Sequence, residues 1–446
     1  MVSSDKHRIR SFADGCRIMV AASAVAFLMI LLPLQLHAQT FSVVHSFTGG
    51  ADGRIPAAGL TMDRAGNLYG TASAGGTQYC SGNGCGVVFK LSSIGGNWIF
   101  TTLYNFQQGS DGANPTARVI FGPNGNLYGT TSQGGGVGDA CNALLGGCGT
   151  VFKLSPPASA CKSALCPWRE TVLYRFNGDD GASPGGEVVF DQSGNLYGTT
   201  AFGGTSGACN PYGTFGCGNV FELMPAQGLW TESVLYNFLA DGNDGTEPFA
   251  NVIFDAAGNL YGTTYAGGAY GGGAVFQLTP SPAAWTEHVL YNQFNYPGGT
   301  APWSGLVFDA AGNLFGTTSR GQPDHTGGTA FELAPLGGGT WAFSTLYIFL
   351  TGDIAGRGPA AGLVMDSAGN SYGTSYTGGA YGDGFVFKLT PQGVFTSLHD
   401  FCAGGYPCTD GCAPESTVMF DASGNLYGTA SGRGPHNGGV VWKITP

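Results

Sequence analysis

The stretch Gly66-Asn67-Leu68-Tyr69-Gly70-Thr71 recurs with little change in seven copies along the chain. The asparagines of the seven copies are Asn67, Asn126, Asn195, Asn259, Asn313, Asn370 and Asn425. An Asp-x-x-Gly turn precedes the stretch in most copies, and polar and apolar residues then alternate, which is typical of a turn followed by a β-strand. The copies are 59, 69, 64, 54, 57 and 55 residues apart, close to the length of a four-stranded propeller blade. The repeat therefore predicts an all-β fold, a seven-bladed β-propeller with four antiparallel strands in each blade.

Each repeat divides into four strands at its own turn residues. The innermost predicted strand, such as residues 252–254, is apolar on both faces, and the Asn-Leu-Tyr-Gly-Thr strand follows it. The third carries Val-Phe-Lys-Leu, as at residues 88–91, and the fourth carries Leu-Tyr-x-Phe, as at residues 103–106. A tryptophan near the start of the fourth strand in five copies indicates packing between blades. We also expect an aromatic ring on each glycine of the second strand, because glycine inside a strand signals a close approach.

The two ends of the repeat region predict how the ring closes. Residues 41–47 match a fourth strand, whereas the chain ends on a third strand at residues 440–444. The last blade therefore has three strands of its own, and the N-terminal strand can supply the outer one, which leaves no sheet edge open. We expect this three-plus-one clasp to bring Val44 close to Val441.

The first 38 residues differ from the repeat region. Four basic residues precede an apolar run from Ile18 to Leu36, and Ala38 offers a small residue for cleavage before Gln39. This pattern predicts a signal peptide at residues 1–38 and a single propeller domain at residues 39–446. The alternative is a retained N-terminal membrane anchor, since the apolar run could just span a bilayer. In either case the propeller would be secreted, periplasmic or at the cell surface.

Charge and cysteine content agree with export. Without residues 1–38, 13 basic and 26 acidic residues remain, and a net charge of about −13 argues against nucleic acid or an anionic membrane surface as a partner. Eight cysteines form close pairs without zinc-site spacing, which predicts disulfides within loops. The pairs are Cys80 with Cys85, Cys141 with Cys148, Cys161 with Cys166, and Cys209 with Cys217. Cys402, Cys408 and Cys412 form a triplet, so that one of them stays free or pairs elsewhere.

The combination of Leu-Tyr-x-Phe, Asp-Gly-x-x-Pro, Asp-x-x-Gly-Asn-Leu-Tyr-Gly-Thr-Thr, Gly-Gly and Val-Phe-Lys-Leu resembles the GloVer tandem repeat of exported bacterial "choice-of-anchor" proteins. The resemblance covers nearly all of residues 39–446 and implies an exported, propeller-like repeat protein. Members typically carry a sorting or anchoring segment after the repeats. Because this chain ends at Pro446 inside its last predicted blade, we expect no C-terminal anchor.

Residues that break the repeat are the candidates for a ligand site. Three positions after the proline of the loop that enters each blade, the copies read Gly59, Arg118, Glu187, Asn251, Gly305, Gly362 and Thr417. One position after that proline, Trp303 and Glu415 replace the small residues of other copies. Because structural positions in a repeat stay uniform, irregular residues near the channel mouth indicate ligand binding, and drift without function is the competing explanation. The candidate ligand-binding residues are Arg118, Glu187, Asn251, Trp303 and Glu415.

The entering loops also carry aspartates, at Asp52, Asp111, Asp180, Asp244 and Asp410. An arc of carboxylates around a channel mouth could bind a divalent cation or a cationic partner. Alternatively, each aspartate caps its own turn, and we favour this interpretation.

No catalytic motif is recognisable, since the sequence offers no Gly-x-Ser-x-Gly elbow that leads from a strand into a helix, no His-Glu-x-x-His helix and no phosphate-binding glycine loop. We therefore expect a non-catalytic binding or scaffold module without a cofactor, a monomer that uses its loop-rich acidic face to bind an extracellular glycan or protein. The alternative is a metal-dependent hydrolase or lyase at the channel mouth, by analogy with other propeller enzymes. Glu187 and Asn251, at equivalent places on adjacent blades, support that alternative, and the metal is left open.

Overall fold

The computed structural model describes residues 39–446 apart from short gaps. The gaps are residues 78, 81, 137–140, 142–145, 158–166, 206, 208, 210–215, 296–297, 322–325 and 351–357. Two predictions therefore lie outside the described residues, the signal peptide at residues 1–38 and the disulfide between Cys161 and Cys166. Among the residues that are described, no helix has the length and apolar character needed to cross a bilayer.

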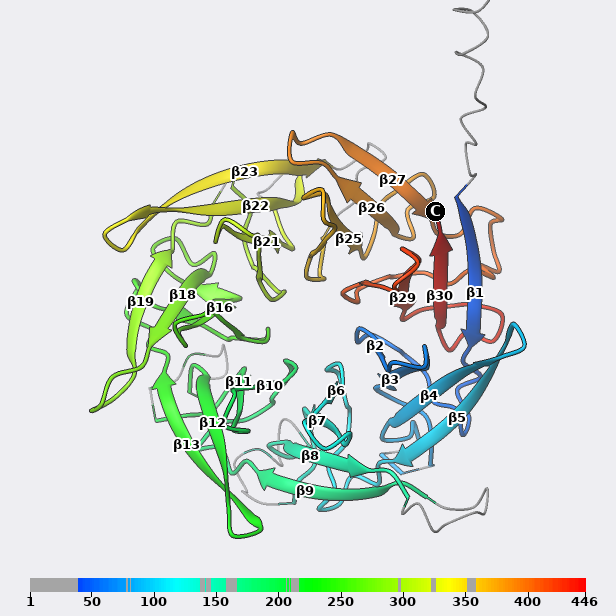
Figure 1. Cartoon of the computed structure of the whole chain (residues 1–446), viewed down its shortest axis with the longest axis horizontal. Helices are drawn as coiled ribbons and strands as arrows, with labels where there is room; N and C mark the ends of the chain where they lie inside the picture. Colours follow the sequence, from blue (N-terminus) through cyan, green and yellow to red (C-terminus); the bar gives the residue numbers. More distant parts are fainter. Residues whose placement is uncertain are drawn as a thin grey trace, which may run out of the picture. The chain divides into compact units, whose positions relative to one another are not determined.

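Residues 40–445 form one unit, in which seven four-stranded sheets stand around a central axis (Figure 1). From the axis outward, the first three blades are β2 (Thr61–Met62), β3 (Leu68–Ala72), β4 (Val87–Ile94) and β5 (Asn97–Asn105); β6 (Ile120–Phe121), β7 (Leu127–Thr131), β8 (Thr150–Ser155) and β9 (Arg169–Arg175); and β10 (Val189–Phe190), β11 (Leu196–Thr200), β12 (Asn219–Ala226) and β13 (Leu229–Asn237). Neighbouring strands in each blade are antiparallel, which confirms the predicted seven-bladed β-propeller.

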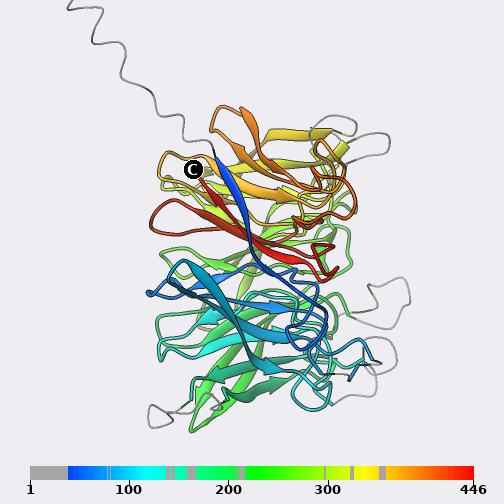
Figure 2. The same cartoon turned by 90° about the vertical axis from the view of Figure 1, so that its right-hand side faces the viewer.

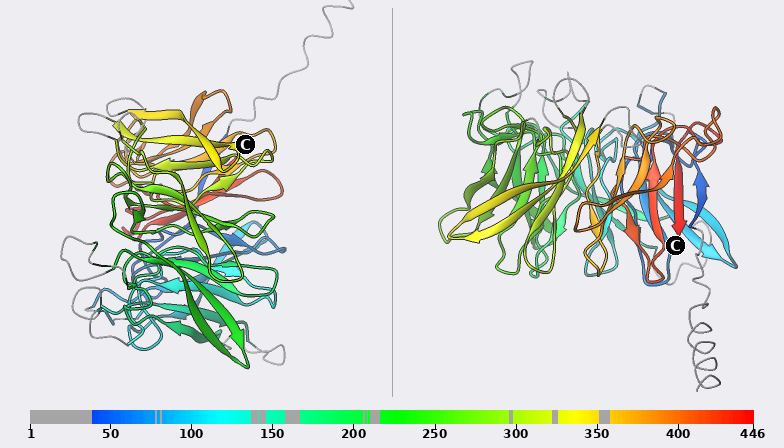
Figure 3. Two further views of the ribbon diagram at one scale, coloured as in Figure 1. Left: turned by 90° about the vertical axis from the view of Figure 1, so that its left-hand side faces the viewer. Right: turned by 90° about the horizontal axis from the view of Figure 1, so that it is seen from above.

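The next three blades follow the same order. They are β15 (Ile253–Phe254), β16 (Leu260–Thr264), β18 (Ala274–Thr279) and β19 (Thr286–Tyr291); β20 (Val307–Phe308), β21 (Leu314–Thr318), β22 (Thr326–Gly337) and β23 (Thr340–Leu350); and β24 (Val364–Met365), β25 (Ser371–Ser375), β26 (Phe385–Leu389) and β27 (Phe395–Asp400). A small extra ladder joins β14 (Gly245–Thr246) to β17 (Ala266–Gly267). Seen from the side, the strands run between the two faces of the ring (Figure 3).

The seventh blade closes the ring with both ends of the repeat region. Its strands are β28 (Met419–Phe420), β29 (Leu426–Ala430), β30 (Val440–Thr445) and, outermost, β1 (Thr40–Ser46). Figure 2 shows β1 lying along β30. Val43 is opposite Trp442 and His45 is opposite Val441, with a register shift at Val44 between them. The predicted clasp is therefore confirmed.

The Asp-x-x-Gly turns are held by their own aspartates. Asp63 Oδ1 accepts hydrogen bonds from the backbone N–H groups of Ala65 and Asn67, each at 2.9 Å. Its Oδ2 accepts from the Asn67 side chain at 2.7 Å and from the Tyr69 hydroxyl at 3.1 Å. Gly66 then takes a φ of 80°, which glycine adopts without a steric penalty. The motif thus encodes a turn that is complete in itself.

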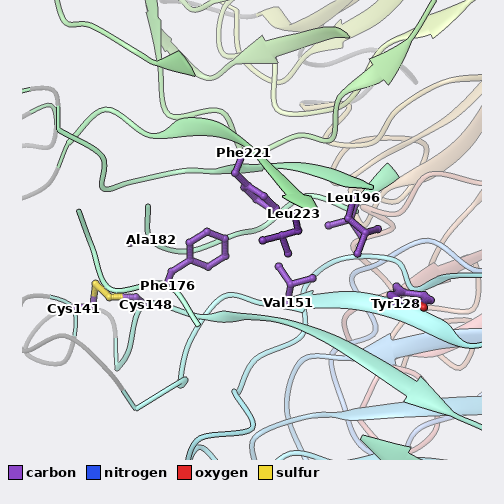
Figure 4. Packing of buried hydrophobic residues seen from close by; sticks show 10 residues of the cluster. Tyr128, Cys141, Cys148, Val151, Phe176, Ala182, Leu196, Phe221 and Leu223 are labelled. Atoms are coloured by element: carbon purple, nitrogen blue, oxygen red, sulfur yellow. A yellow bond between two sulfur atoms is a disulfide. The ribbon is translucent and has the colours of Figure 1, made fainter. Parts of the chain in front are cut away.

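Glycine in the second strand makes room for an aromatic ring, as expected. A Cβ atom on Gly198 would lie 2.6 Å from Cζ of Phe221, so any side chain there would clash with the ring. The other six second-strand glycines face a phenylalanine or Trp442 at a similarly short distance. Figure 4 shows Phe221 in the core that the second and third blades share, with Val151, Phe176 and Leu196 around it. Close backbone approach therefore allows large rings to fill the core.

Five tryptophans of the outer strands pack between blades, as the repeat predicted. Each one approaches a second-strand tyrosine of the preceding blade, with ring centroids 6.1–6.5 Å apart. The pairs are Trp98 with Tyr427, Trp168 with Tyr69, Trp230 with Tyr128, Trp285 with Tyr197, and Trp341 with Tyr261. The first pair joins blade one to blade seven, so that this packing crosses the closure point as well.

A belt of buried threonine hydroxyls links every blade to the next around the axis. The threonine of each Tyr-Gly-Thr motif donates to a backbone carbonyl of the following blade, at distances of 2.7–3.1 Å. The pairs are Thr71 with Ala117, Thr130 with Gly186, Thr199 with Ala250, Thr263 with Ser304, Thr317 with Ala361, Thr374 with Ser416 and Thr429 with Ala58. The recurring threonine is therefore explained by contact between blades.

Candidate functional site

Two rings of residues line the central channel, one from each of two repeat positions. In each blade, the residue directly after the proline of the entering loop belongs to the mouth ring. These residues are Ala57, Thr116, Gly185, Phe249, Trp303, Ala360 and Glu415. The residue three positions after the same proline belongs to the waist ring. These residues are Gly59, Arg118, Glu187, Asn251, Gly305, Gly362 and Thr417. Both rings border one cavity of about 130 Å³.

All five candidate residues line this cavity. Trp303 and Glu415 belong to the mouth ring, and Arg118, Glu187 and Asn251 belong to the waist ring. We expected these residues on the innermost strand of each blade, but they lie just before the residues of that strand that pair with its neighbour. Pairing begins two residues after the waist ring, as at Thr61 after Gly59. The candidates lie on a short unpaired segment, which leaves their side chains free to point into the channel. Ligand binding by these residues stays a prediction.

Arg118 and Glu187 form an ion pair between the second and third blades. Nη2 of Arg118 donates to Oε1 of Glu187 at 2.8 Å, and Nε donates to the other carboxylate oxygen. Burial lowers the pKa of Arg118 and the Glu187 carboxylate raises it, with a net increase. A partly buried carboxylate that already holds a guanidinium is a poor metal ligand, because the two cations compete for the same oxygens.

The rest of the waist is filled by contacts among its own residues. The Asn251 amide donates to the Val252 carbonyl at 3.4 Å, and its oxygen would lie only 2.2 Å from a Cβ atom on Gly305. On the opposite side, Gly362 donates its N–H to the Thr417 hydroxyl at 3.1 Å. Glycine at two waist positions thus accommodates polar side chains from neighbouring blades. The waist forms a polar floor beneath the mouth.

An aromatic platform occupies one side of the mouth. The indole of Trp303 is stacked on the Phe249 ring, with centroids 4.6 Å apart and planes at 10°. Tyr265 meets the Trp303 ring edge-on at 5.0 Å. Trp303 is nevertheless 41% exposed, so the platform is open to solvent. Phe249 was not among the predicted site residues, although its position in blade four is that of Trp303 in blade five.

The mouth continues over blades four to seven as a groove of about 400 Å³. Its walls include Trp303, Glu415, Tyr265, Arg320 and Tyr376. The Arg320 guanidinium lies 5.3 Å from the Tyr265 ring centroid, and Tyr376 is 44% exposed. Burial raises the pKa of the Glu415 carboxyl, opposed in part by a hydrogen bond with Ser431.

Sequence reasoning also missed Tyr265, Arg320 and Tyr376, although the repeat contained the signal. All five other copies have a small residue at the position of Tyr265 and Tyr376, namely Ser73, Ser132, Ala201, Ser319 and Ser431. Aromatic residues therefore break the repeat at a third position, and the ring geometry brings that position next to the mouth.

The aspartates of the entering loops cap their own turns. Asp111 Oδ2 accepts from the Gln107 N–H at 3.0 Å and from the Tyr104 hydroxyl at 3.0 Å. Asp180 and Asp244 bind a backbone N–H and a tyrosine hydroxyl in the same way, and at Asp52 and Asp410 a histidine replaces the tyrosine. These carboxylates are engaged locally, which supports the capping interpretation over a shared cation site.

Three of the four predicted cysteine pairs are bonded in the structure. They are Cys80–Cys85, Cys141–Cys148 and Cys209–Cys217. The fourth differs, because Cys161 and Cys166 both fall in the gap at residues 158–166. The disulfide between Cys161 and Cys166 is therefore not confirmed and stays a prediction from the sequence.

The cysteine triplet contains the fourth disulfide that the structure describes. Cys402 is bonded to Cys408, and Cys412 is a buried free thiol. Within the described ranges, one group of His, Cys, Asp and Glu side chains is close enough to hold a metal ion, and it consists of Asp383, Cys402 and Cys408. Because its two sulfur atoms form the disulfide, they are not available as thiolate ligands.

Comparison with known proteins concerns both the repeat and the fold. A model of the Gloeobacter/Verrucomicrobia repeat matches residues 30–208, 144–349 and 282–446. No curated protein has a matching sequence. Similar solved structures include a putative 6-phosphogluconolactonase from Bacteroides uniformis, with 14% identity, 79% of this chain and 87% of that chain covered, and a TM-score of 0.47. A periplasmic gluconolactonase from Pseudomonas aeruginosa has 15% identity, covers 82% and 97%, and has a TM-score of 0.46.

An ulvan lyase of polysaccharide lyase family 25 is also similar in structure. Its identity is 9%, 88% of this chain and 94% of that chain are covered, and the TM-score is 0.51. At such low identity the likeness shows the fold alone.

Proposed function

This chain belongs to the Gloeobacter/Verrucomicrobia repeat family, and we propose that it is an exported, non-catalytic module that binds a glycan at the mouth of its central channel. The observation that carries this proposal is the solvent-open platform of Trp303 on Phe249. The apolar C–H face of a pyranose ring packs on a flat aromatic surface, and a pre-stacked indole loses little freedom when the sugar binds.

Polar groups around the platform can bind the sugar hydroxyls. Arg320 offers donors, the Glu415 carboxyl offers an acceptor, and Tyr376 offers a hydroxyl along the same groove. Among the small mouth residues, Gly185 borders Phe249, and Gly185 and Thr116 leave space for the ligand to enter. A few polar groups set around an apolar surface are typical of a small-molecule site.

The alternative, a metal-dependent hydrolase or lyase, has less support from the same residues. Among the described residues that line the channel, the carboxylates are Glu187 and Glu415. Glu187 holds Arg118, so it is poorly suited to bind a metal or to act as a free base. Glycosidases typically need two free carboxyl groups that flank the bond. We therefore favour binding without catalysis.

The test uses residues 39–446 and a panel of neutral oligosaccharides, with affinities measured by calorimetry. We expect Trp303→Ala to lower the affinity about tenfold, because losing one aromatic stacking contact costs about 1.4 kcal/mol. Trp303→Phe is the matched control and should retain most of the affinity, since it keeps a flat ring. Equal binding by wild type and Trp303→Ala would exclude the platform as the site. A stoichiometric metal ion that is lost in Glu187→Gln would favour the alternative.

A further inference from the structure

A second pocket lies between the loops of blades six and seven, apart from the channel mouth. We call it the rim pocket. It has a volume of about 400 Å³, and its walls include Tyr381, Asp383, Tyr406, Arg433 and the Cys402–Cys408 disulfide. Tyr381 and Asp383 follow β25, and Tyr406 follows β27, so the walls come from neighbouring parts of the ring in Figure 1. None of these residues lines the mouth cavity or its groove.

Arg433 stands where the repeat otherwise uses glycine. Four residues after the belt threonine, the other six copies have glycine, and φ lies between 75° and 84° at Gly75, Gly134, Gly203, Gly267 and Gly378. Arg433 adopts a φ of 55° at the same position. Side chains other than those of glycine, asparagine and aspartate rarely adopt this left-handed conformation, because Cβ approaches the following carbonyl oxygen. Because Arg433 breaks the repeat at a position where glycine fits the backbone better, its side chain is a candidate for ligand contact.

Hydrogen bonds from one nitrogen atom of the Arg433 guanidinium fix the orientation of the group. Nη1 donates to Asp383 Oδ2 at 3.2 Å and to Cys408 Sγ at 3.0 Å. The side chains of Arg433 and Asp383 remain 42% and 25% exposed. The pocket therefore presents a donor and an acceptor side by side, and their opposite charges cancel. Such an Arg–Asp pair matches two adjacent hydroxyl groups, one of which donates and one of which accepts.

Two exposed tyrosines supply apolar surface beside this pair. Tyr381 is 53% exposed and Tyr406 is 81% exposed. Tyr406 lies inside the loop that the Cys402–Cys408 disulfide closes, and a hydrogen bond from the Gly405 N–H to the Cys402 carbonyl forms a turn in the same loop. A short closed loop limits the freedom that Tyr406 can lose on binding.

We propose that the rim pocket is a second saccharide site, which binds a neutral sugar through two adjacent hydroxyls on Arg433 and Asp383 and through its ring on Tyr381 or Tyr406. Neutral sugars are favoured because Arg433 and Asp383 compensate each other and residues 39–446 carry a net charge of about −13, which repels anions. The inference extends the proposed function to two sites on one propeller. A long glycan that reached both would gain avidity without any further contact.

The experiment titrates residues 39–446 with neutral mannose and glucose oligosaccharides and with a glucuronic acid oligosaccharide, followed by saturation-transfer NMR and calorimetry. The decisive variant is Arg433→Gly, which restores the residue of the other copies and should fold at least as stably as wild type. We expect it to remove one of two binding events and to leave unchanged the event that Trp303→Ala weakens. Tyr381→Ala should weaken the same event as Arg433→Gly. Its matched control, Tyr270→Ala, changes the equivalent Gly-Gly-Ala-Tyr-Gly loop of blade four and should have no effect.

The outcomes separate this inference from the proposed function. Unchanged stoichiometry and affinity in Arg433→Gly would overturn the rim site, whether or not Trp303→Ala weakens the other binding event. Loss of one event in Arg433→Gly with no effect of Trp303→Ala would support the rim site and refute the mouth site. Binding of the acidic oligosaccharide at the rim as tightly as the neutral ones would contradict the neutral class proposed for the ligand.

Discussion

Replacing Thr429 by valine should measure how strongly the threonine belt holds the ring at its closure point. The Thr429 hydroxyl donates to the Ala58 carbonyl at 3.0 Å, across 371 residues of sequence, and Thr429 and Ala58 are 1% and 6% exposed. Valine keeps the shape of the side chain and removes the donor. Leaving the buried carbonyl without this partner should cost about 1–3 kcal/mol. Thr429→Ser keeps the hydroxyl and loses one methyl group, so it should cost only about 0.8 kcal/mol.

The assay is equilibrium unfolding in urea, followed by tryptophan fluorescence, on wild type and both variants. We expect the midpoint to fall for Thr429→Val by more than for Thr429→Ser. Thr199→Val, which removes the equivalent bond to Ala250 at 2.7 Å inside the ring, should behave like Thr429→Val if all belt bonds contribute alike. A valine variant as stable as the serine variant would refute the belt as a source of stability.

Two further predictions concern the clasp and pH. Deleting residues 41–47 should lower the melting temperature sharply, because the deletion removes the outer strand of blade seven and the fully buried Phe47. Burial of the Phe47 ring alone contributes about 3–5 kcal/mol to the free energy of unfolding. An unchanged melting temperature would contradict the closure of the ring by this strand. Burial, together with nearby aspartates, raises the pKa values of Glu170, Glu232 and Glu287 to about 7. Above pH 4.5, the folded state therefore binds more protons at these three glutamates than the unfolded state does. The free energy of unfolding that the glutamates contribute is fully present below pH 4.5 and is lost as the pH rises through 7. Melting temperatures at pH 5 and pH 8 should differ less in a variant with all three glutamates changed to glutamine, and an equal difference would refute this origin.

Much of the candidate site could be found by comparing repeat copies, because residues that leave a uniform pattern stand out. This comparison identified Trp303 and Glu415 at the mouth, and the structure places both on the cavity wall. It overlooked Phe249 at the same repeat position. Tyr265 and Tyr376 break the repeat elsewhere, and their distance in sequence from the mouth residues hides the fact that they line the same groove.

The sequence by itself determined the number of blades, the order of their strands and the closure of the ring. These features depend on local chemistry, since Asp63 and Gly66 form their turn within a few residues and strand alternation has a short period. Only the tertiary structure decided which irregular residues meet. Arg118 and Glu187 are 69 residues apart, and their ion pair depends on the angle between two blades and on the depth of each side chain in the channel. The pairing also changes the chemistry expected of Glu187, because a carboxylate that holds a guanidinium is poorly available to a metal.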